Sequence, residues 1–220
     1  MATDRYATAG MGGLPARHAE AHRVRKAAPA DLAPLAKAMA AAFYDDPVAS
    51  WLLRDDARRL RRLERGFTLF LRQLYLPAGE CHTTEHVAGG ALWLPPGRWQ
   101  AGPVTQLRVL AGLPRICGSE LPRFLRYSRL MESKHRARSE DHYYLPYMGV
   151  EPGCQGRGIG SALLRPVLER CDSEGVPAYL EASTPRNRDL YERHGFEVLE
   201  EVELAAGGPV HWLMWRKPEG

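Results

Sequence analysis

The ten residues EPGCQGRGIG, at positions 151–160, include four glycines and lie between a stretch that predicts a strand (142–150) and one that predicts a helix (158–175). Glycines let several backbone N–H groups point to one side of a turn, and the first turn of a helix adds free donors and partial positive charge. A plain tight connection is the simpler interpretation of a glycine-rich turn. Three glycines at alternate positions each cost chain entropy on folding, so the pattern favours a phosphate-binding turn.

Two common phosphate loops fit this turn poorly. A P-loop needs G-x-x-x-x-G-K-[ST], and no lysine lies between His135 and Lys217. A dinucleotide-binding turn needs G-x-G-x-x-G directly after a strand, whereas here the spacing is G-x-G-x-G and residues 152–155 intervene. Glu181 stands where a ribose-binding acid would, but only about sixty residues remain to complete such a sheet.

The composition is that of one ordinary globular domain, with 220 residues, 45% hydrophobic and 25% charged. Residues 1–20 lack periodicity and predict a disordered arm, which leaves a single domain over 21–220. The net charge of +4 gives a mild bias toward anionic ligands and makes a nucleic-acid-binding protein a competing class. No stretch of the sequence reads as an export signal or a membrane span, and the four cysteines lack metal-binding spacing. We therefore expect a cytoplasmic protein without metal, membrane or nucleic-acid partners.

Strand and helix patterns alternate along the chain, which predicts a mixed α/β fold. Residues 98–141 indicate helical fragments broken at Pro103, Pro114 and Pro122, whose order the sequence does not give. The other expected elements include strands at 22–28, 142–150, 177–183, 197–204 and 210–217, and helices at 29–43, 57–76, 158–175 and 187–195. Residues 80–97 predict two further strands, joined by a tight turn near Glu85 and His86 and ended by the Pro95–Gly97 stretch.

Residues 155–160 (QGRGIG) resemble the Q/R-x-x-G-x-G/A acyl-CoA signature of the GNAT superfamily of N-acetyltransferases. Asn187 together with YERHGF at 191–196 is similar to that family's N-x-x-x-Y-E-x-x-G-F segment. Across 142–217 the likeness is strongest to puromycin N-acetyltransferase-like members, and it extends weakly upstream to cover about 195 residues.

The resemblance implies a three-layer fold, with about seven strands in a mixed sheet, splayed central strands, flanking helices and a helical insertion at 98–141. It also implies an acetyltransferase that uses acetyl-CoA as acyl donor and no metal. The thioester arm would lie along the strand before the turn, and the diphosphate on the amides of 156–161. The residues that the resemblance assigns to the cofactor are Met148, Gly149, Val150, Gln155, Gly156, Arg157, Gly158, Ile159, Gly160, Ser161, Asn187 and Tyr191.

Acetyl transfer to an amine needs a neutral nucleophile, a stabilised oxyanion and a proton for the departing thiolate. A phenol with a pKa of about 10 is protonated at neutral pH, and the resemblance places Tyr191 beside the sulfur, so we expect Tyr191 to be the general acid. Without the motif, a core tyrosine would be the simpler interpretation. Glu181, at a predicted strand end, is expected to be the general base or a substrate anchor, unless it only pairs with a nearby arginine.

The acceptor is less defined by the sequence. Asp46, His142 and Tyr143 are candidate acceptor contacts, although acids in a turn such as FYDDP more often end a helix. We expect a small-molecule amine, an antibiotic or a metabolite, as the substrate of a monomer or homodimer. A non-catalytic acyl-CoA sensor and an acetyltransferase for protein amines remain alternatives.

Overall fold

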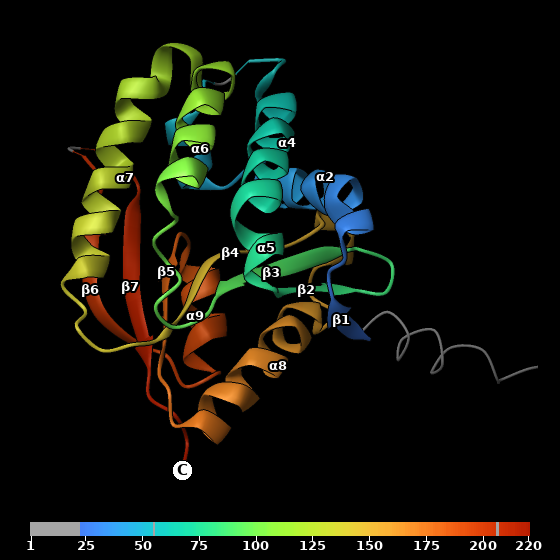
Figure 1. The fold of residues 1–220 in the computed structure, drawn as a ribbon, viewed down its shortest axis with the longest axis vertical. Helices are drawn as coiled ribbons and strands as arrows, with labels where there is room; N and C mark the ends of the chain where they lie inside the picture. Colours follow the sequence, from blue (N-terminus) through green and yellow to red (C-terminus); the bar gives the residue numbers. More distant parts are fainter. Residues whose placement is uncertain (1–22, 55, 206) are drawn as a thin grey trace, which may run out of the picture.

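The computed structural model describes residues 23–54, 56–205 and 207–220 (Figure 1). The arm expected at 1–20 lies outside the described residues. Seven strands form one sheet in the order β1-β2-β3-β4-β5-β7-β6. Only the β4–β5 pair is parallel, so the sheet is mixed, as the sequence predicts. The strands are β1 (Val24–Lys26), β2 (Glu80–Thr84), β3 (Gly89–Leu94), β4 (Tyr143–Val150), β5 (Ala178–Ala182), β6 (Glu197–Glu203) and β7 (Val210–Arg216).

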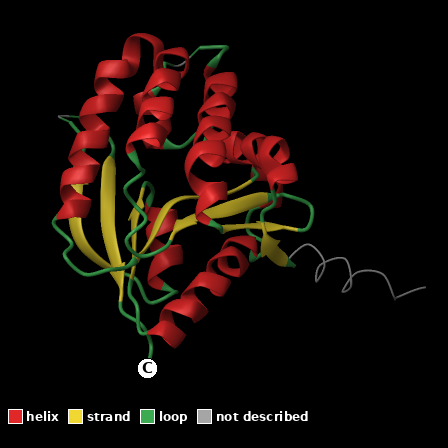
Figure 2. Ribbon diagram, in the orientation of Figure 1, coloured by secondary structure: helices red, strands yellow, loops and turns green. Residues whose placement is uncertain are grey.

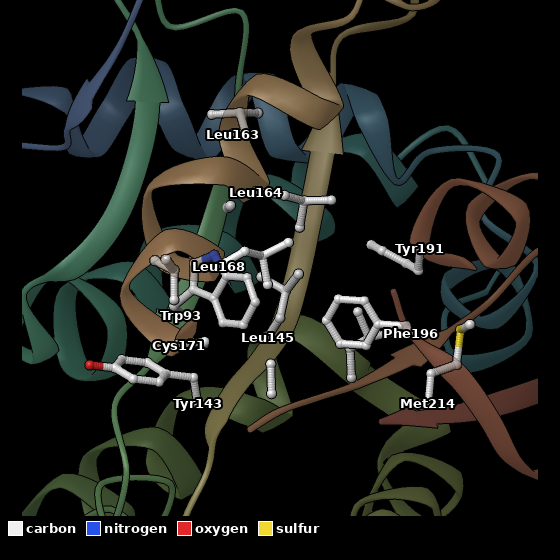
Figure 3. Close-up of a cluster of buried hydrophobic side chains, with 14 of the residues drawn as sticks. Trp93, Tyr143, Leu145, Leu163, Leu164, Leu168, Cys171, Tyr191, Phe196 and Met214 are labelled. Carbon is white, nitrogen blue, oxygen red and sulfur yellow. The ribbon is translucent and has the colours of Figure 1, made fainter. Parts of the chain in front are cut away.

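Helices cover both faces of the sheet and make three layers (Figures 1 and 2). One face is covered by α8 (Ile159–Glu174) and α9 (Pro185–Glu192). Their apolar side chains meet those of the central strands in the cluster of Figure 3, which includes Trp93, Leu145 and Met214. The other face is covered by α2 (Leu32–Ala42), α3 (Pro47–Leu52), α4 (Arg59–Phe70), α6 (Pro103–Cys117) and α7 (Leu121–Arg136).

Prolines in 98–141 act differently from the sequence-based expectation. Pro103 and Pro122 occupy the first turns of α6 and α7, where a missing N–H costs nothing. Pro114 lies inside α6, close to its end, so two long helices replace the expected fragments.

The helix expected at 57–76 is interrupted. After α4, residues Leu71–Tyr75 form a π-helical turn, and α5 (Leu76–Ala78) follows. Such turns are rare and often lie at functional sites. Here the turn ends at Tyr75, whose ring lies 5.9 Å from that of Tyr147 on β4. The short helix α3 has no counterpart among the expected elements, because six residues are too few to show a helical period.

The two central strands diverge within the sheet. β4 has eight residues, but only Tyr143, Tyr144 and Leu145 pair with β5. The pairing stops at Pro146, which has no N–H to donate to a ladder. On its other edge β4 stays paired with β3 as far as Val150. The edge of β4 that faces β5 is therefore open over its second half, which is the splay that the family resemblance implies.

All four cysteines are free thiols. Within the described ranges, the side chains include no group of His, Cys, Asp and Glu arranged to hold a metal ion. No helix in the described part of the chain combines the length and apolarity needed to cross a bilayer.

Candidate functional site

A cavity opens where β4 and β5 separate. Aromatic and aliphatic side chains from the α2–α3 region, α4 and β4 make most of its wall. Its polar lining includes Asp46, Glu181, Ser183, Asn187 and Tyr191. The cavity therefore brings together the candidate base and the candidate acid of the sequence analysis, which come from opposite faces of the sheet.

Glu181 lies near the end of β5, between Leu180 and Ala182 of the core. Its Oε2 accepts a hydrogen bond of 2.9 Å from the Tyr144 hydroxyl. Desolvation raises the pKa of Glu181 to about 7, even though hydrogen bonds to its carboxylate act in the opposite direction. A carboxyl group that titrates near neutral pH is suited to accept a proton from an amine.

Tyr191 projects from α9 into the same cavity. The helix starts at Thr184, whose hydroxyl caps it by accepting from the Asn187 amide at 3.1 Å. Tyr191 is 5% exposed and packs against Phe196, with ring centroids 5.9 Å apart (Figure 3). Burial raises the pKa of its phenol above the ordinary value, so the hydroxyl keeps its proton at neutral pH. Asn187, one helical turn earlier, lines the cavity beside it.

Asp46 lines the cavity but is also the N-cap of α3. Its Oδ1 accepts from the amides of Val48 (3.0 Å) and Ala49 (2.9 Å), and its Oδ2 accepts from the Ser183 hydroxyl. Burial raises its pKa, and these three hydrogen bonds counteract that effect. The carboxylate therefore ties α3 to the end of β5. Asp46 begins a helix, whereas the alternative for the FYDDP turn expected it to end one.

His142 and Tyr143 line neither this cavity nor a second cavity that adjoins it. His142 is buried, with Nδ1 2.6 Å from the Glu140 carbonyl and Nε2 2.9 Å from Nε2 of His135. Tyr143 lies in the core under α8 and donates to Glu174 at 2.9 Å (Figure 3).

The glycine turn has the backbone that a nest of N–H groups needs. Gly156 and Gly158 have φ values of 74° and 80°, in the left-handed region, and Gly158 is the N-cap of α8. Gln155 braces the turn, because its side chain donates to the Val150 carbonyl (3.0 Å) and accepts from Arg186 (3.1 Å). No heavy atom of the described chain, apart from the adjoining residues, lies within 4 Å of where a Cβ of Gly156 would be. The turn therefore has left-handed glycines directly before the first amides of α8, which is the backbone geometry of an anion-binding nest.

The other residues that the resemblance assigns to the cofactor differ in where they lie: at the cavity, in the packed interior or on the surface. Met148 lines the cavity from the unpaired half of β4. Gly149 serves packing, since a Cβ there would lie 2.8 Å from the Cβ of Ala42 on α2. Ser161, in the first turn of α8, has its Oγ 2.9 Å from the ring of His194. Ile159 is buried, and Arg157 is exposed on the turn.

Sequence reasoning missed several groups that line the cavity, among them Tyr127, Tyr147 and His211. His211 could have been found from the sequence. Residues two apart on a strand share a face, so His211 lies on the same face of β7 as Leu213 of the core, and a polar side chain on that buried face is unusual. Tyr127 lies on α7, in the region where no helix could be delimited from the sequence.

Part of the chain is similar to known acetyltransferases. Residues 118–196 match the model of the acetyltransferase (GNAT) family. An uncharacterized N-acetyltransferase of Schizosaccharomyces pombe is 29% identical over 191 residues, which cover 81% of this chain and 76% of the relative. Mycothiol acetyltransferase of Beutenbergia cavernae is 44% identical over a segment of 52 residues, which covers 22% of this chain and 18% of that protein.

Solved structures share the fold over most of the chain. A histone acetyltransferase HPA2-related acetyltransferase from Corynebacterium glutamicum superposes with a TM-score of 0.66, at 24% identity, and the match covers 90% of this chain and 97% of that one. The polyamine N-acetyltransferase of Drosophila melanogaster gives a TM-score of 0.59 at 16% identity, with 88% and 98% covered. The mixed seven-stranded sheet flanked by helices is therefore the GNAT fold.

Proposed function

We propose that this chain, an N-acetyltransferase of the GNAT superfamily, moves an acetyl group from acetyl-CoA to the amine of a small molecule, an antibiotic or a metabolite, by direct transfer. One observation carries the proposal: Glu181 and Tyr191 line the same cavity at the point where β4 and β5 separate. An acceptor there would have a proton acceptor on one side and a proton donor on the other.

The glycine turn supports acetyl-CoA as the donor. Its left-handed glycines and the start of α8 suit the diphosphate, and the open edge of β4 beyond Leu145 suits the extended arm that carries the thioester. Met148 and Asn187 line the cavity between these two regions of the site. Among the acceptor contacts expected from the sequence, Asp46 lines the cavity, but its carboxylate already accepts three hydrogen bonds from the chain.

The chemistry follows from the two titratable groups. Glu181 takes a proton from the acceptor amine, and the neutral nitrogen attacks the thioester carbonyl carbon, forming the C–N bond. The C–S bond then breaks, and the Tyr191 hydroxyl gives its proton to the sulfur. The attacking nitrogen then loses its second proton, which passes through solvent to the Tyr191 phenolate, and Glu181 releases the first proton to solvent. An ammonium and acetyl-CoA thus yield an amide, the free CoA thiol and one proton.

An assay of acetyl-CoA turnover against a panel of primary amines tests the proposal. It should include puromycin, because residues 142–217 resemble puromycin N-acetyltransferase-like enzymes. We expect release of free thiol in step with the acetylated amine. Saturable acetyl-CoA binding without turnover on any amine would indicate a sensor, and turnover confined to protein N-termini or lysines would indicate a protein acetyltransferase. A chain that neither binds acetyl-CoA nor releases thiol would contradict the proposal.

A further inference from the structure

A second cavity, of about 680 Å³, adjoins the first. It extends from Glu181 toward the residues before α6 and lies between α5, α6 and α7. Residues that line both cavities include Phe70, Phe124, Tyr127, Tyr147, Glu181 and His211. Because the candidate base lies where the two cavities meet, a ligand in the second cavity can present an amine to it.

The two adjoining cavities together, here called the shared space, have few negatively charged side chains. Among the described lining residues, only Asp46, Glu132 and Glu181 carry carboxyl groups. Asp46 already accepts three hydrogen bonds, and Glu132 pairs with Arg136 at 2.7 Å. Glu181 is thus the carboxyl group left to meet a cation. A polyamine would place further ammonium groups in this space without partners, which is costly for buried charges.

The wall of the shared space is aromatic. The ring of Tyr147 is nearly parallel to that of Phe70, with an interplanar angle of 11° and centroids 6.2 Å apart. The rings of Phe43 and Phe67 meet Tyr147 edge-on, at 5.7 and 5.4 Å. Apolar walls of this kind favour a ligand with an aromatic or similarly apolar body.

His211 is a buried polar residue in this largely aromatic wall. It is 4% exposed, and neither ring nitrogen has a hydrogen-bond partner among the described residues. Its ring meets Tyr127 edge-on, with centroids 5.8 Å apart. Burial lowers the pKa of His211 to about 4, so the imidazole is neutral at pH 7 and offers one donor and one acceptor. Because a buried polar group without a partner is costly, a ligand group that bonds it accounts for its presence.

We infer that the two cavities form one acceptor site for a primary amine that has a single positive charge and an aromatic body, and that His211 hydrogen-bonds a polar substituent on that body. The inference rests on the proposed function and narrows its substrate class. Glu181 meets the amine, the rings around Tyr147 hold the apolar part, and His211 sets the preference among aromatic amines.

The first test compares kcat/KM for tyramine, 2-phenylethylamine and puromycin with that for spermidine and agmatine, at saturating acetyl-CoA. We expect the best aromatic amine to exceed both polycationic amines at least tenfold. If a polyamine is the better acceptor, the inference fails while the proposed function stands. If acetyl-CoA does not bind, or no amine is acetylated, the proposed function fails and the inference with it.

The second test addresses His211 through three variants. His211→Phe should raise the KM for the best aromatic acceptor roughly 3- to 10-fold, with the KM for acetyl-CoA unchanged. His211→Gln keeps a donor and an acceptor and should recover most of the loss. The matched control is His82→Phe, because His82 is also 4% exposed with an unpartnered ring nitrogen but lies outside both described cavities. Thermal denaturation verifies that each variant folds. An unchanged acceptor KM in folded His211→Phe would overturn the role of His211.

Discussion

At the scale of single residues, the proposed mechanism makes turnover depend on the proton of the Tyr191 hydroxyl. Tyr191→Phe removes one oxygen from a side chain that is packed against Phe196, so the fold should stand. We expect kcat to fall roughly 10²- to 10⁴-fold, with the dissociation constant of acetyl-CoA changed less than about threefold. Stopped assays and calorimetry measure the two quantities.

The control is Tyr143→Phe, which removes a buried tyrosine hydroxyl outside both described cavities. It should leave kcat within about twofold. If Tyr191→Phe behaves like this control, Tyr191 is not the acid.

The titration of Glu181 sets the pH dependence. A general base works when deprotonated, and the pKa of Glu181 is raised to about 7. For an acceptor amine whose own pKa lies below the pH range of the assay, kcat/KM should therefore rise as pH increases through about 7. Above that pH it should level off. Glu181→Gln should lower the plateau and remove the inflection. A wild-type profile without an inflection between pH 6 and 8 would count against the assignment.

The raised pKa of Glu181 also makes the stability of the fold depend on pH, and stability should fall over the pH range in which activity rises. The carboxyl of Glu181 has a higher pKa in the folded chain than in the unfolded chain, so the folded state binds the proton more tightly. Its contribution to stability is present below the unfolded pKa of about 4.3 and is lost as pH rises through about 7. Glu181→Gln has no such proton, so its melting temperature relative to that of wild type should increase from pH 5 to pH 8. A difference that is constant with pH would contradict the raised pKa.

The positions of these residues were predictable to unequal degrees. Tyr191 and Asn187 could be chosen because a local motif carries them, and Glu181 because it ends a recognisable strand. Their meeting in one cavity could not be derived from spacing, since it depends on the divergence of β4 and β5. His142 and Tyr143 sit beside each other in the sequence, but alternation turns them to opposite faces of the sheet.

At the scale of elements, two glycine variants can distinguish the effect of the glycine turn on acetyl-CoA binding from its effect on stability. Gly156→Ala adds a Cβ into open space at a left-handed φ, so it should cost about 1–2 kcal/mol of unfolding free energy and also weaken acetyl-CoA binding. Gly175→Ala is the matched control: its φ is 67°, its Cβ also meets nothing within 4 Å, and it lies at the far end of α8. It should lose similar stability and keep its acetyl-CoA affinity. Equal affinities in the two variants would exclude the turn from the cofactor site.

The elements themselves were predictable where a pattern runs long enough. The strand–turn–helix around 142–175 could be delimited closely, because alternation, glycines and a leucine period agree there. The π-helical turn at Leu71–Tyr75 could not, since it continues an amphipathic helix without any change in composition. At 98–141 the prolines suggested breaks, yet a proline in a first helical turn is harmless, and this position was not recognised.

At the scale of the whole molecule, one sheet joins the cofactor side to the acceptor side. β4 pairs antiparallel with β3 on one edge and makes three parallel pairs with β5 on the other, so it joins two antiparallel halves. The class of fold could be predicted from alternating elements, and the splay followed from the family resemblance alone. The strand order was not predicted, because pairings distant in sequence leave no local pattern. The splay removes backbone pairs from the middle of the sheet, so a ligand placed there should stabilise both halves together.

This continuity predicts how acetyl-CoA affects unfolding. At about 100 times its dissociation constant, a ligand that binds only the folded state adds about 2.7 kcal/mol. For a chain of this size that corresponds to a rise in melting temperature of roughly 5–10 °C. Because the sheet is continuous through β4 and β5, calorimetry should show one transition with and without the ligand, and the transition should move as a whole. Gly156→Ala should show a smaller rise than Gly175→Ala at the same ligand concentration. Two transitions, of which acetyl-CoA moves only one, would mean that the halves unfold separately and that the splay does not couple them.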